Sequence, residues 1–213
     1  MEQEEFMLIY LDANIVQYCA DYERFILGDD TTPPTSDAKL LKELEALRTL
    51  FELEQLGQGW EVPAPTHLIK ELLRGKPTPN QQNTYDILLR AWQDSASQEF
   101  VETNEEKITS IERSLHPLKF KDPADRWHLA EAVALEASWF LTNDANIISA
   151  TRQEAKSIGN VQGVLFALPS EGNDRNIISR AHLKAKHIGD VQGVLVARPS
   201  ECIEDISTGL FLR

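Results

Sequence analysis

The chain has 213 residues, and its 34 acidic and 21 basic side chains give a formal charge of −13 at pH 7. This length, with 42% hydrophobic and 26% charged residues, predicts one ordinary globular domain, or one domain with an appendage, and excludes a disordered chain or a disulfide scaffold. The negative charge argues against broad electrostatic adhesion to nucleic acid, although a local basic rim can still guide a phosphate backbone.

The terminal segment 1–5 is acidic and lacks the positive charge of a secretory leader. No apolar run approaches the roughly 18–20 residues that span a bilayer. The only two cysteines, Cys19 and Cys202, are therefore expected to be free thiols in a reducing compartment. We expect a cytoplasmic protein that has no membrane segment.

The first predicted element is a strand over 6–11, because a continuous apolar run is typical of a strand buried on both faces. Helical residues follow from about 15 to 58 and are split by a loop of polar residues, glycine and proline over 28–35. Ser36 or Asp37 could cap the second of these helices.

The central part of the chain is predicted to be mainly helical. Thr66 is a candidate N-cap for a helix that runs to Leu73 and is ended by Gly75 and Pro77. Further elements are expected as helices at 80–94 and 105–115, a short strand at 100–101, a helix introduced by 122–125 that runs over 126–137, and a buried strand at 139–142. Alternating strands and helices predict an α/β fold with a mostly parallel sheet and right-handed crossovers.

The last third of the chain contains an internal repeat. Residues 143–171 align without gaps on 173–201, with 19 identities in 29 pairs. Two copies are too few for a solenoid, which needs about three, so we interpret the repeat as a local tandem duplication of about 30 residues.

Each copy of the repeat ends in a candidate strand, 164–168 in the first and 194–198 in the second. The first is wholly apolar and reaches the sheet by the shorter connection, so we expect it beside the 139–142 strand. The second carries Arg198 and is expected to be an added edge strand or a segment packed on a neighbouring subunit, because a charge blunts an edge. In the rival arrangement the second copy is inserted and the first is a loop.

Four acidic residues stand where a ligand site is expected. Asp12 and Asp144 directly follow predicted strands, and ligands of open α/β sheets bind beyond the carboxyl ends of the strands. Glu71 and Asp125 lie on helices that should approach the same end. Converging carboxylates repel each other unless a cation neutralises them, and Mg²⁺ and Mn²⁺ prefer carboxylate and water oxygens. Such a site suits phosphodiester hydrolysis, in which the cation activates water and stabilises the charge on the phosphate.

Four motifs, in this order and spacing, resemble those of PIN-domain ribonucleases, the group that includes the VapC toxins. They are the apolar strand with Asp-Ala-Asn at 12–14, then 66–73, 125–130 and 140–144. The resemblance covers about 6–75 and 118–168. It implies a PIN-like nuclease domain over 1–170, with a mostly parallel sheet flanked by helices, a helical insertion at 21–59, and the duplicated helix-strand unit 171–213 appended to it.

The resemblance also implies a function. PIN-type toxins are metal-dependent endoribonucleases that leave a 5′-phosphate and a 3′-hydroxyl, often as homodimers held by an antitoxin protein. By this resemblance, Mg²⁺ or Mn²⁺ would be bound by a catalytic quartet of acids, which are Asp12, Glu71, Asp125 and Asp144. Two neighbours, Asn14 and Thr142, would orient these ligands.

Each of these residues has an alternative role. Asp12 could only cap the following helix, and Glu71 could belong to a solvated helix face. Asp122 could take the place of Asp125, since either could cap the helix that begins there. Asp174 is the duplicate of Asp144 and is expected in a loop.

Basic and histidine residues give weaker indications. A basic rim flanks the proposed ligands and would suit RNA, although surface solubility explains it equally well; its members are Lys70, Arg74, Lys76 and Arg126, with Lys119 and Lys121. His128 is expected to be a packed, hydrogen-bonded helix residue rather than a ligand. No partner at zinc spacing exists for His67, His182 or His187.

Two other functions share parts of this pattern. A haloacid-dehalogenase-type phosphatase also has an Asp after its first strand, but it needs a second Asp two residues later, where this chain has Asn14. A non-catalytic PIN-like scaffold could bind RNA or a protein partner, because fold does not guarantee activity. Metal-dependent cleavage of single-stranded RNA separates a nuclease from such a scaffold.

Overall fold

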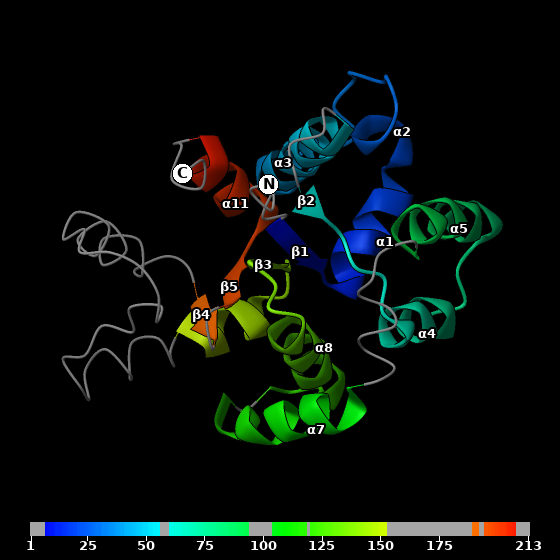
Figure 1. The fold of residues 1–213 in the computed structure, drawn as a ribbon. Coiled ribbons are helices and arrows are strands. Elements are labelled where there is room, and N and C mark those ends of the chain that lie inside the picture. The colour runs from blue at the N-terminus through cyan, green and yellow to red at the C-terminus, as the bar shows by residue number, and fades with distance from the viewer. Residues whose placement is uncertain are drawn as a thin grey trace, which may run out of the picture.

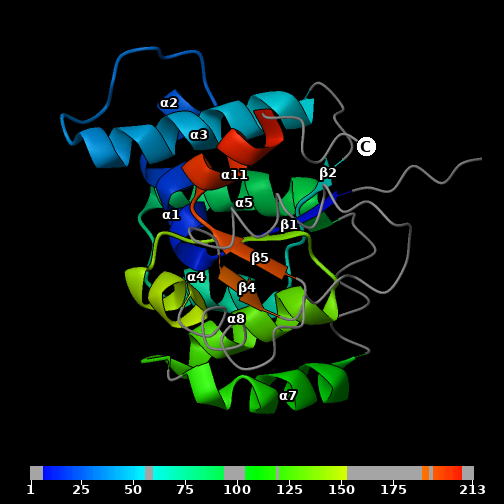
Figure 2. The same cartoon turned by 90° about the vertical axis from the view of Figure 1, so that its left-hand side faces the viewer.

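A five-stranded sheet with helices on both faces forms the centre of the protein, as a computed structural model shows (Figure 1, Figure 2). The structure describes residues 7–55, 60–93, 104–118, 120–152, 189–191 and 194–207. The strands are β1 (Met7–Leu11), β2 (Trp60–Glu61), β3 (Trp139–Leu141), β4 (Gly189–Val191) and β5 (Val194–Ala197), in the spatial order β2-β1-β3-β5-β4. Only β4 runs antiparallel to its neighbour. The α/β class and the mostly parallel sheet are therefore confirmed.

The central strands are apolar at every position because both sides of the sheet are covered. Ile9 and Leu11 of β1 lie in the core on one side, and Tyr10 lies in the core on the other. β3 repeats this alternation, with Leu141 on the first side and Phe140 on the second. This is why these segments are continuous apolar runs instead of alternating ones.

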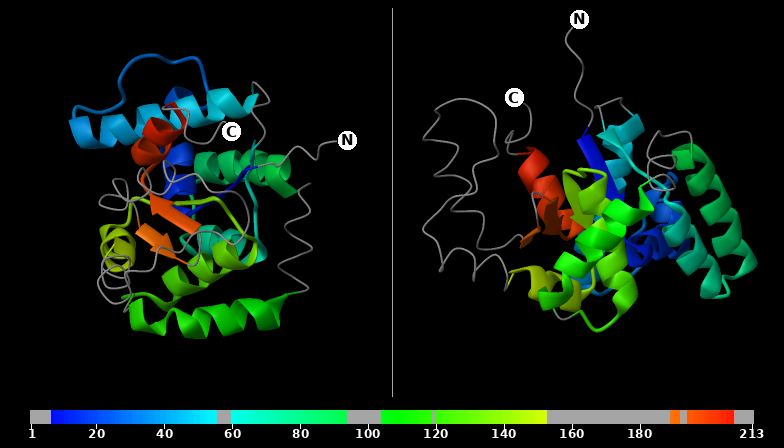
Figure 3. Two further views of the ribbon diagram at one scale, coloured as in Figure 1. Left: turned by 60° about the vertical axis from the view of Figure 1, so that its left-hand side comes forward. Right: turned by 60° about the horizontal axis from the view of Figure 1, so that its bottom comes forward.

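The larger helical layer covers the first side of the sheet (Figure 3). Its helices are α1 (Ala13–Asp21), α2 (Glu23–Ile26), α3 (Ala38–Gln55), α4 (Thr66–Arg74), α5 (Pro79–Gln93) and α11 (Pro199–Ser207). Asp37 caps α3, since its Oδ1 accepts from the backbone N of Lys39 at 2.9 Å. The N-cap prediction for Thr66 is wrong: α4 begins at Thr66 itself, and Pro65, in extended conformation, occupies the cap position.

The other side of the sheet is covered by α7 (Glu105–Ser114), the 3₁₀ helix η1 (His116–Leu118) and α8 (Pro123–Ala134). Residues 145–152, which follow the turn after β3, are also helical. The sequence predicted the α8 helix over 126–137, which is displaced towards the C-terminus relative to its observed bounds. The helix begins at Pro123 because Asp122 caps it, and Glu136 beyond its end has a left-handed φ of 57°.

The position of the second repeat copy corrects the sequence-based expectation. β5 comes from this copy and pairs in parallel with β3, so it is not an edge strand. The edge strand on this side of the sheet is β4, from the same copy. Arg198 did not exclude this position because it lies just beyond β5, where its backbone N donates to the Glu201 carboxylate at 2.9 Å. The first-copy candidate 164–168 and the strand expected at 100–101 lie outside the described residues.

Two features of the composition have structural counterparts. Cys19 and Cys202 are both buried in the core and form no disulfide, as expected. Among the helices in the described ranges, none has the length and apolar character needed to cross a bilayer.

Candidate metal centre

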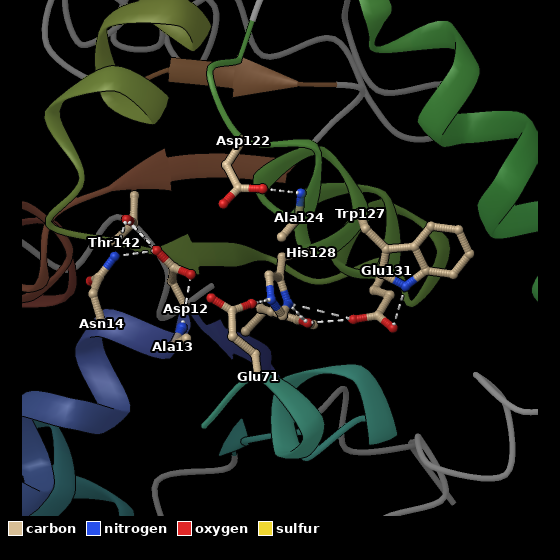
Figure 4. A network of polar contacts seen from close by, with 11 residues as sticks. Asp12, Ala13, Asn14, Glu71, Asp122, Ala124, Trp127, His128, Glu131 and Thr142 are labelled. Carbon is tan, nitrogen blue, oxygen red and sulfur yellow. Dashed lines mark hydrogen bonds and ion pairs between the residues drawn. The ribbon is translucent and has the colours of Figure 1, made fainter. Parts of the chain in front are cut away.

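Asp12 lies at the carboxyl end of β1 and is only 4% exposed. Its Oδ1 accepts a hydrogen bond from the backbone N of Ala13 at 2.8 Å, so it caps α1. Its Oδ2 accepts from the Thr142 hydroxyl at 2.7 Å and from the amide of Asn14 (Figure 4). Capping therefore uses one oxygen, while the other faces the polar cluster at the end of the sheet.

Thr142 and Asn14 join the start of α1 to the turn after β3. The Thr142 hydroxyl, which donates to Asp12, accepts from the backbone N of Asp144 at 3.0 Å. The Asn14 Oδ1 accepts from the backbone N of Asn143 at 3.1 Å. Such hydrogen bonds are the contacts that an orienting role for these two residues requires.

Asp144 follows β3 and is half-buried. Its Oδ1 accepts from both the backbone N of Asn146 at 2.6 Å and the side-chain amide of the same residue at 2.9 Å. It therefore caps the helical residues 145–152. Asp174, its duplicate in the repeat, lies outside the described residues.

Asp122 and Asp125 differ in burial and in the contacts of their carboxylates. Asp122 is exposed, and its Oδ1 accepts from the backbone N of Ala124 at 2.9 Å. Asp125 is half-buried in the first turn of α8. Burial, together with the charges of Asp12, Asp144 and Asp122, raises the pKa of Asp125 to about 7. Asp12, Asp125 and Asp144 thus share one electrostatic neighbourhood.

Glu71 of α4 approaches the cluster from the opposite side and is held by His128. The two side chains are 2.5 Å apart between Glu71 Oε2 and His128 Nε2, and this hydrogen bond is the main cause that lowers the pKa of Glu71. Burial and the charge of Glu71 both raise the pKa of Asp12. Figure 4 shows Asp12 and Glu71 reaching into the same space beside α8.

His128 is the centre of a buried network behind the acids. It is 1% exposed, and its Nδ1 lies 2.9 Å from the hydroxyl of Tyr10, which donates to Glu131 at 2.6 Å. Burial lowers the pKa of His128, but Glu131, Glu71 and Asp12 outweigh it and raise the pKa to about 10. The expected packing and hydrogen bonding of His128 are confirmed, whereas its expected absence from a ligand set is not tested by these contacts.

Sequence reasoning missed the importance of His67. It lies one turn before Glu71 on α4, and its ring centroid is 5.0 Å from that of His128. The ligand atoms of His67, Glu71 and His128 all lie within 4.8 Å of one another, so the three could hold a metal ion. The spacing of four between His67 and Glu71 was visible in the sequence, but the third member comes from a different helix.

Only part of the predicted basic rim is exposed to solvent, where it could contact RNA. Lys70, Arg74 and Lys76 are exposed, as is Lys121, and the charge of Arg74 contributes to the lowered pKa of Glu71. Arg126 differs, because it is 16% exposed and its Nε donates to Glu112 of α7 at 2.8 Å. Lys119 lies outside the described residues.

The donors fall into two adjoining sets that share Glu71. The first set consists of carboxylates and suits a hard divalent cation such as Mg²⁺ or Mn²⁺. The raised pKa of Asp125 fits this set, since like charges crowd there without a cation to neutralise them. The second set is His67, Glu71 and His128.

Comparison with known proteins adds no relative. No model of a protein family matches the chain, and neither a curated protein nor a solved structure matches it. The assignment of function therefore depends on the site and on the motifs that form it.

Proposed function

We propose that this protein is a divalent-metal-dependent endoribonuclease of the PIN type, which hydrolyses phosphodiester bonds in single-stranded RNA. The observation that carries the proposal is the meeting of acids from separate elements at the carboxyl ends of β1 and β3. Asp12 and Asp144 follow these strands and are joined through Thr142, while Asp125 adds its charge from α8. This edge of an α/β sheet is where ligands bind.

Each residue has a role in this mechanism. The acids Asp12, Glu71, Asp125 and Asp144 would hold Mg²⁺ or Mn²⁺, and Asn14 and Thr142 would fix the direction of Asp12. A bound cation would supply activation of water and stabilisation of the charge that grows on the phosphate. Exposed Lys70, Arg74 and Lys76 on and after α4 would attract the RNA backbone.

The biological setting is proposed from the resemblance alone. In this proposal the protein is a cytoplasmic toxin that is held by an antitoxin protein, or a related RNA-processing nuclease. It acts as a homodimer. Light scattering during gel filtration tests the dimer. Co-purification with the product of a small neighbouring gene tests the antitoxin.

The decisive experiment measures cleavage of end-labelled single-stranded RNA with Mn²⁺ and with excess EDTA. We expect Asp12→Asn to abolish cleavage, and Asp125→Asn and Asp144→Asn each to lower the rate by at least ~100-fold, because each removes a group that positions the metal. Asp122→Asn is the matched control: asparagine also caps helices, so the rate should stay within a few-fold of wild type.

The products and the controls decide between the hypotheses. Fragments with a 5′-phosphate and 3′-hydroxyl are expected. Cleavage in EDTA, or a loss in Asp122→Asn that Asp125→Asn does not share, would show that the mechanism or the placement of the motif is wrong. RNA binding without cleavage in Mn²⁺ would favour the non-catalytic scaffold.

A further inference from the structure

His67 and Glu71 are presented together by α4. Residues four apart on a helix lie on the same face, one above the other. From α8, His128 brings its Nε2 to 2.5 Å from the Glu71 carboxylate, and its ring meets that of His67 edge-on at 5.0 Å. Three potential ligand atoms within 4.8 Å of one another therefore come from two helices that are distant in sequence.

The hydrogen bonds behind His128 determine which ring nitrogen faces this group. The Tyr10 hydroxyl donates its proton to Glu131 at 2.6 Å, so towards His128 Nδ1, at 2.9 Å, its oxygen can only accept. Nδ1 must therefore carry a proton, and Nε2 is the nitrogen left to bind either a proton or a metal. A ligand histidine is usually held through its second nitrogen by a hydrogen bond, and here the Tyr10 hydroxyl, itself bonded to the Glu131 carboxylate, takes that place.

His67 is suited to the same task. It is half-buried against Trp127 and His128, with ring centroids 5.7 and 5.0 Å away. Its ring meets that of His128 edge-on, and a ring nitrogen of each lies within 4.8 Å of the Glu71 carboxylate. Imidazole nitrogens bind zinc and similar ions in the neutral state.

We propose that His67, Glu71 and His128 form a second cation site, which takes a borderline transition-metal ion such as Zn²⁺. Two imidazoles and one carboxylate match zinc, whereas Mg²⁺ prefers oxygen ligands alone. Three protein ligands leave a coordination position open, as in zinc sites that stay accessible to water. The site requires only these three residues, so it does not depend on the proposed nuclease activity.

The sharing of Glu71 has a consequence for the carboxylate set. A Zn²⁺ ion bound by Glu71 and the two histidines would occupy the carboxylate that borders Asp12. Glu71→Gln should therefore weaken the binding of both Zn²⁺ and Mn²⁺. His67→Ala should weaken only Zn²⁺, and Asp125→Asn should weaken only Mn²⁺.

The test is a competition titration of the full chain with Zn²⁺ against a chromophoric chelator. We expect His67→Ala to weaken Zn²⁺ binding by roughly 100-fold and Tyr10→Phe by about 10-fold, since loss of an outer hydrogen bond costs about 10–100-fold in affinity. His116→Ala is the matched control, because this histidine of η1 is 60% exposed and lies outside the group. It should bind Zn²⁺ as the wild type does.

A second measurement identifies the ligands without relying on a variant that must fold. Zn²⁺ should shift the ring-nitrogen NMR resonances of two of the five histidines in the wild-type chain, and those of His67 are identified by their loss in His67→Ala. Equal Zn²⁺ affinity in His67→Ala and the wild type, or shifts confined to other histidines, would overturn the proposal. RNA cleavage enters neither readout, so a failure here is distinguishable from a failure of the nuclease function.

Discussion

Replacing Asp125 with asparagine should stabilise the metal-free protein. Burial and the charges of Asp12 and Asp144 raise the pKa of this carboxyl from 3.8 to about 7. Asparagine has nearly the same shape but carries no charge, so it removes the repulsion among these acids. This gain in folding stability is expected only while no cation neutralises the charges of Asp12, Asp125 and Asp144.

The size and sign of the effect follow from this pKa. A displacement of about three pH units corresponds to at most about 4 kcal/mol, and solvent screening at this half-buried side chain reduces it to about 1–2 kcal/mol. Between about pH 4 and pH 7 the folded protein binds the proton that the unfolded chain has lost, so wild-type stability falls as pH rises. The advantage of the variant should therefore grow through this window and stay constant above it.

The assay is thermal unfolding in EDTA at several pH values. At pH 8 we expect the melting temperature of Asp125→Asn to exceed that of the wild type by roughly 2–8 °C, and the difference to shrink towards pH 4. Saturating Mn²⁺ should stabilise the wild type more than the variant, because a ligand that binds the folded state raises its stability. A variant less stable than the wild type at pH 8, or a gain equal to that of Asp122→Asn, would refute the proposed crowding of charges.

Three further predictions concern the framework around the site. Thr142→Val removes the hydroxyl that donates to Asp12 and should cost about 1–3 kcal/mol in denaturant unfolding while weakening Mn²⁺ binding. Glu43→Gln should cost about 1 kcal/mol, because the buried Glu43 carboxylate accepts from both the backbone N and the hydroxyl of Ser200 and hydrogen bonds to a charged group are stronger than those to an amide. Deletion of 153–182 should leave cooperative unfolding and Mn²⁺ binding intact, as measured by calorimetry and titration.

Controls for the first two predictions are available in the same elements. Thr142→Ser keeps the hydroxyl and should retain Mn²⁺ binding; if it behaves as Thr142→Val, the hydrogen bond is not the cause. Glu45→Gln changes an exposed carboxylate of α3 and should leave stability within about 0.5 kcal/mol of wild type. A similar loss in Glu45→Gln and Glu43→Gln would contradict the role assigned to the contact between α3 and α11.

The parts of the fold that sequence predicted are those that local pattern determines. The apolar run of β1 and the turn at Asp12 could be identified because burial on both faces requires apolar residues at every position and the polar site begins where they stop. The same reasoning located Asp144 after β3. Asp125 could not be separated from Asp122 by strand patterns, because both stand where a helix begins and their difference in burial and in the hydrogen bond to Ala124 appears only in the structure.

The parts that sequence did not predict depend on pairs of distant residues. The spacing of four between His67 and Glu71 is visible in the sequence, but the third residue of the group, His128, comes near them only because α4 and α8 meet. Arg126 was predicted to belong to the basic rim, but its Nε donates a hydrogen bond to Glu112 of α7. Periodicity identifies the face of a helix but not which helix lies opposite.

The expected tolerance of the 153–182 deletion is a consequence of the repeat. The two copies share Val-Gln-Gly-Val-Leu and Pro-Ser-Glu, so β5 could in principle come from either, but the residues after Pro-Ser-Glu differ. The first copy continues into Gly172, which disfavours helix, whereas the second continues into Cys202 and Ile203, which carry α11 onto the core. Removing 30 residues joins Arg152 to the equivalent place in the second copy and keeps β3, β5 and α11. Loss of cooperative unfolding in this variant would show that the removed residues are needed to hold β5 beside β3.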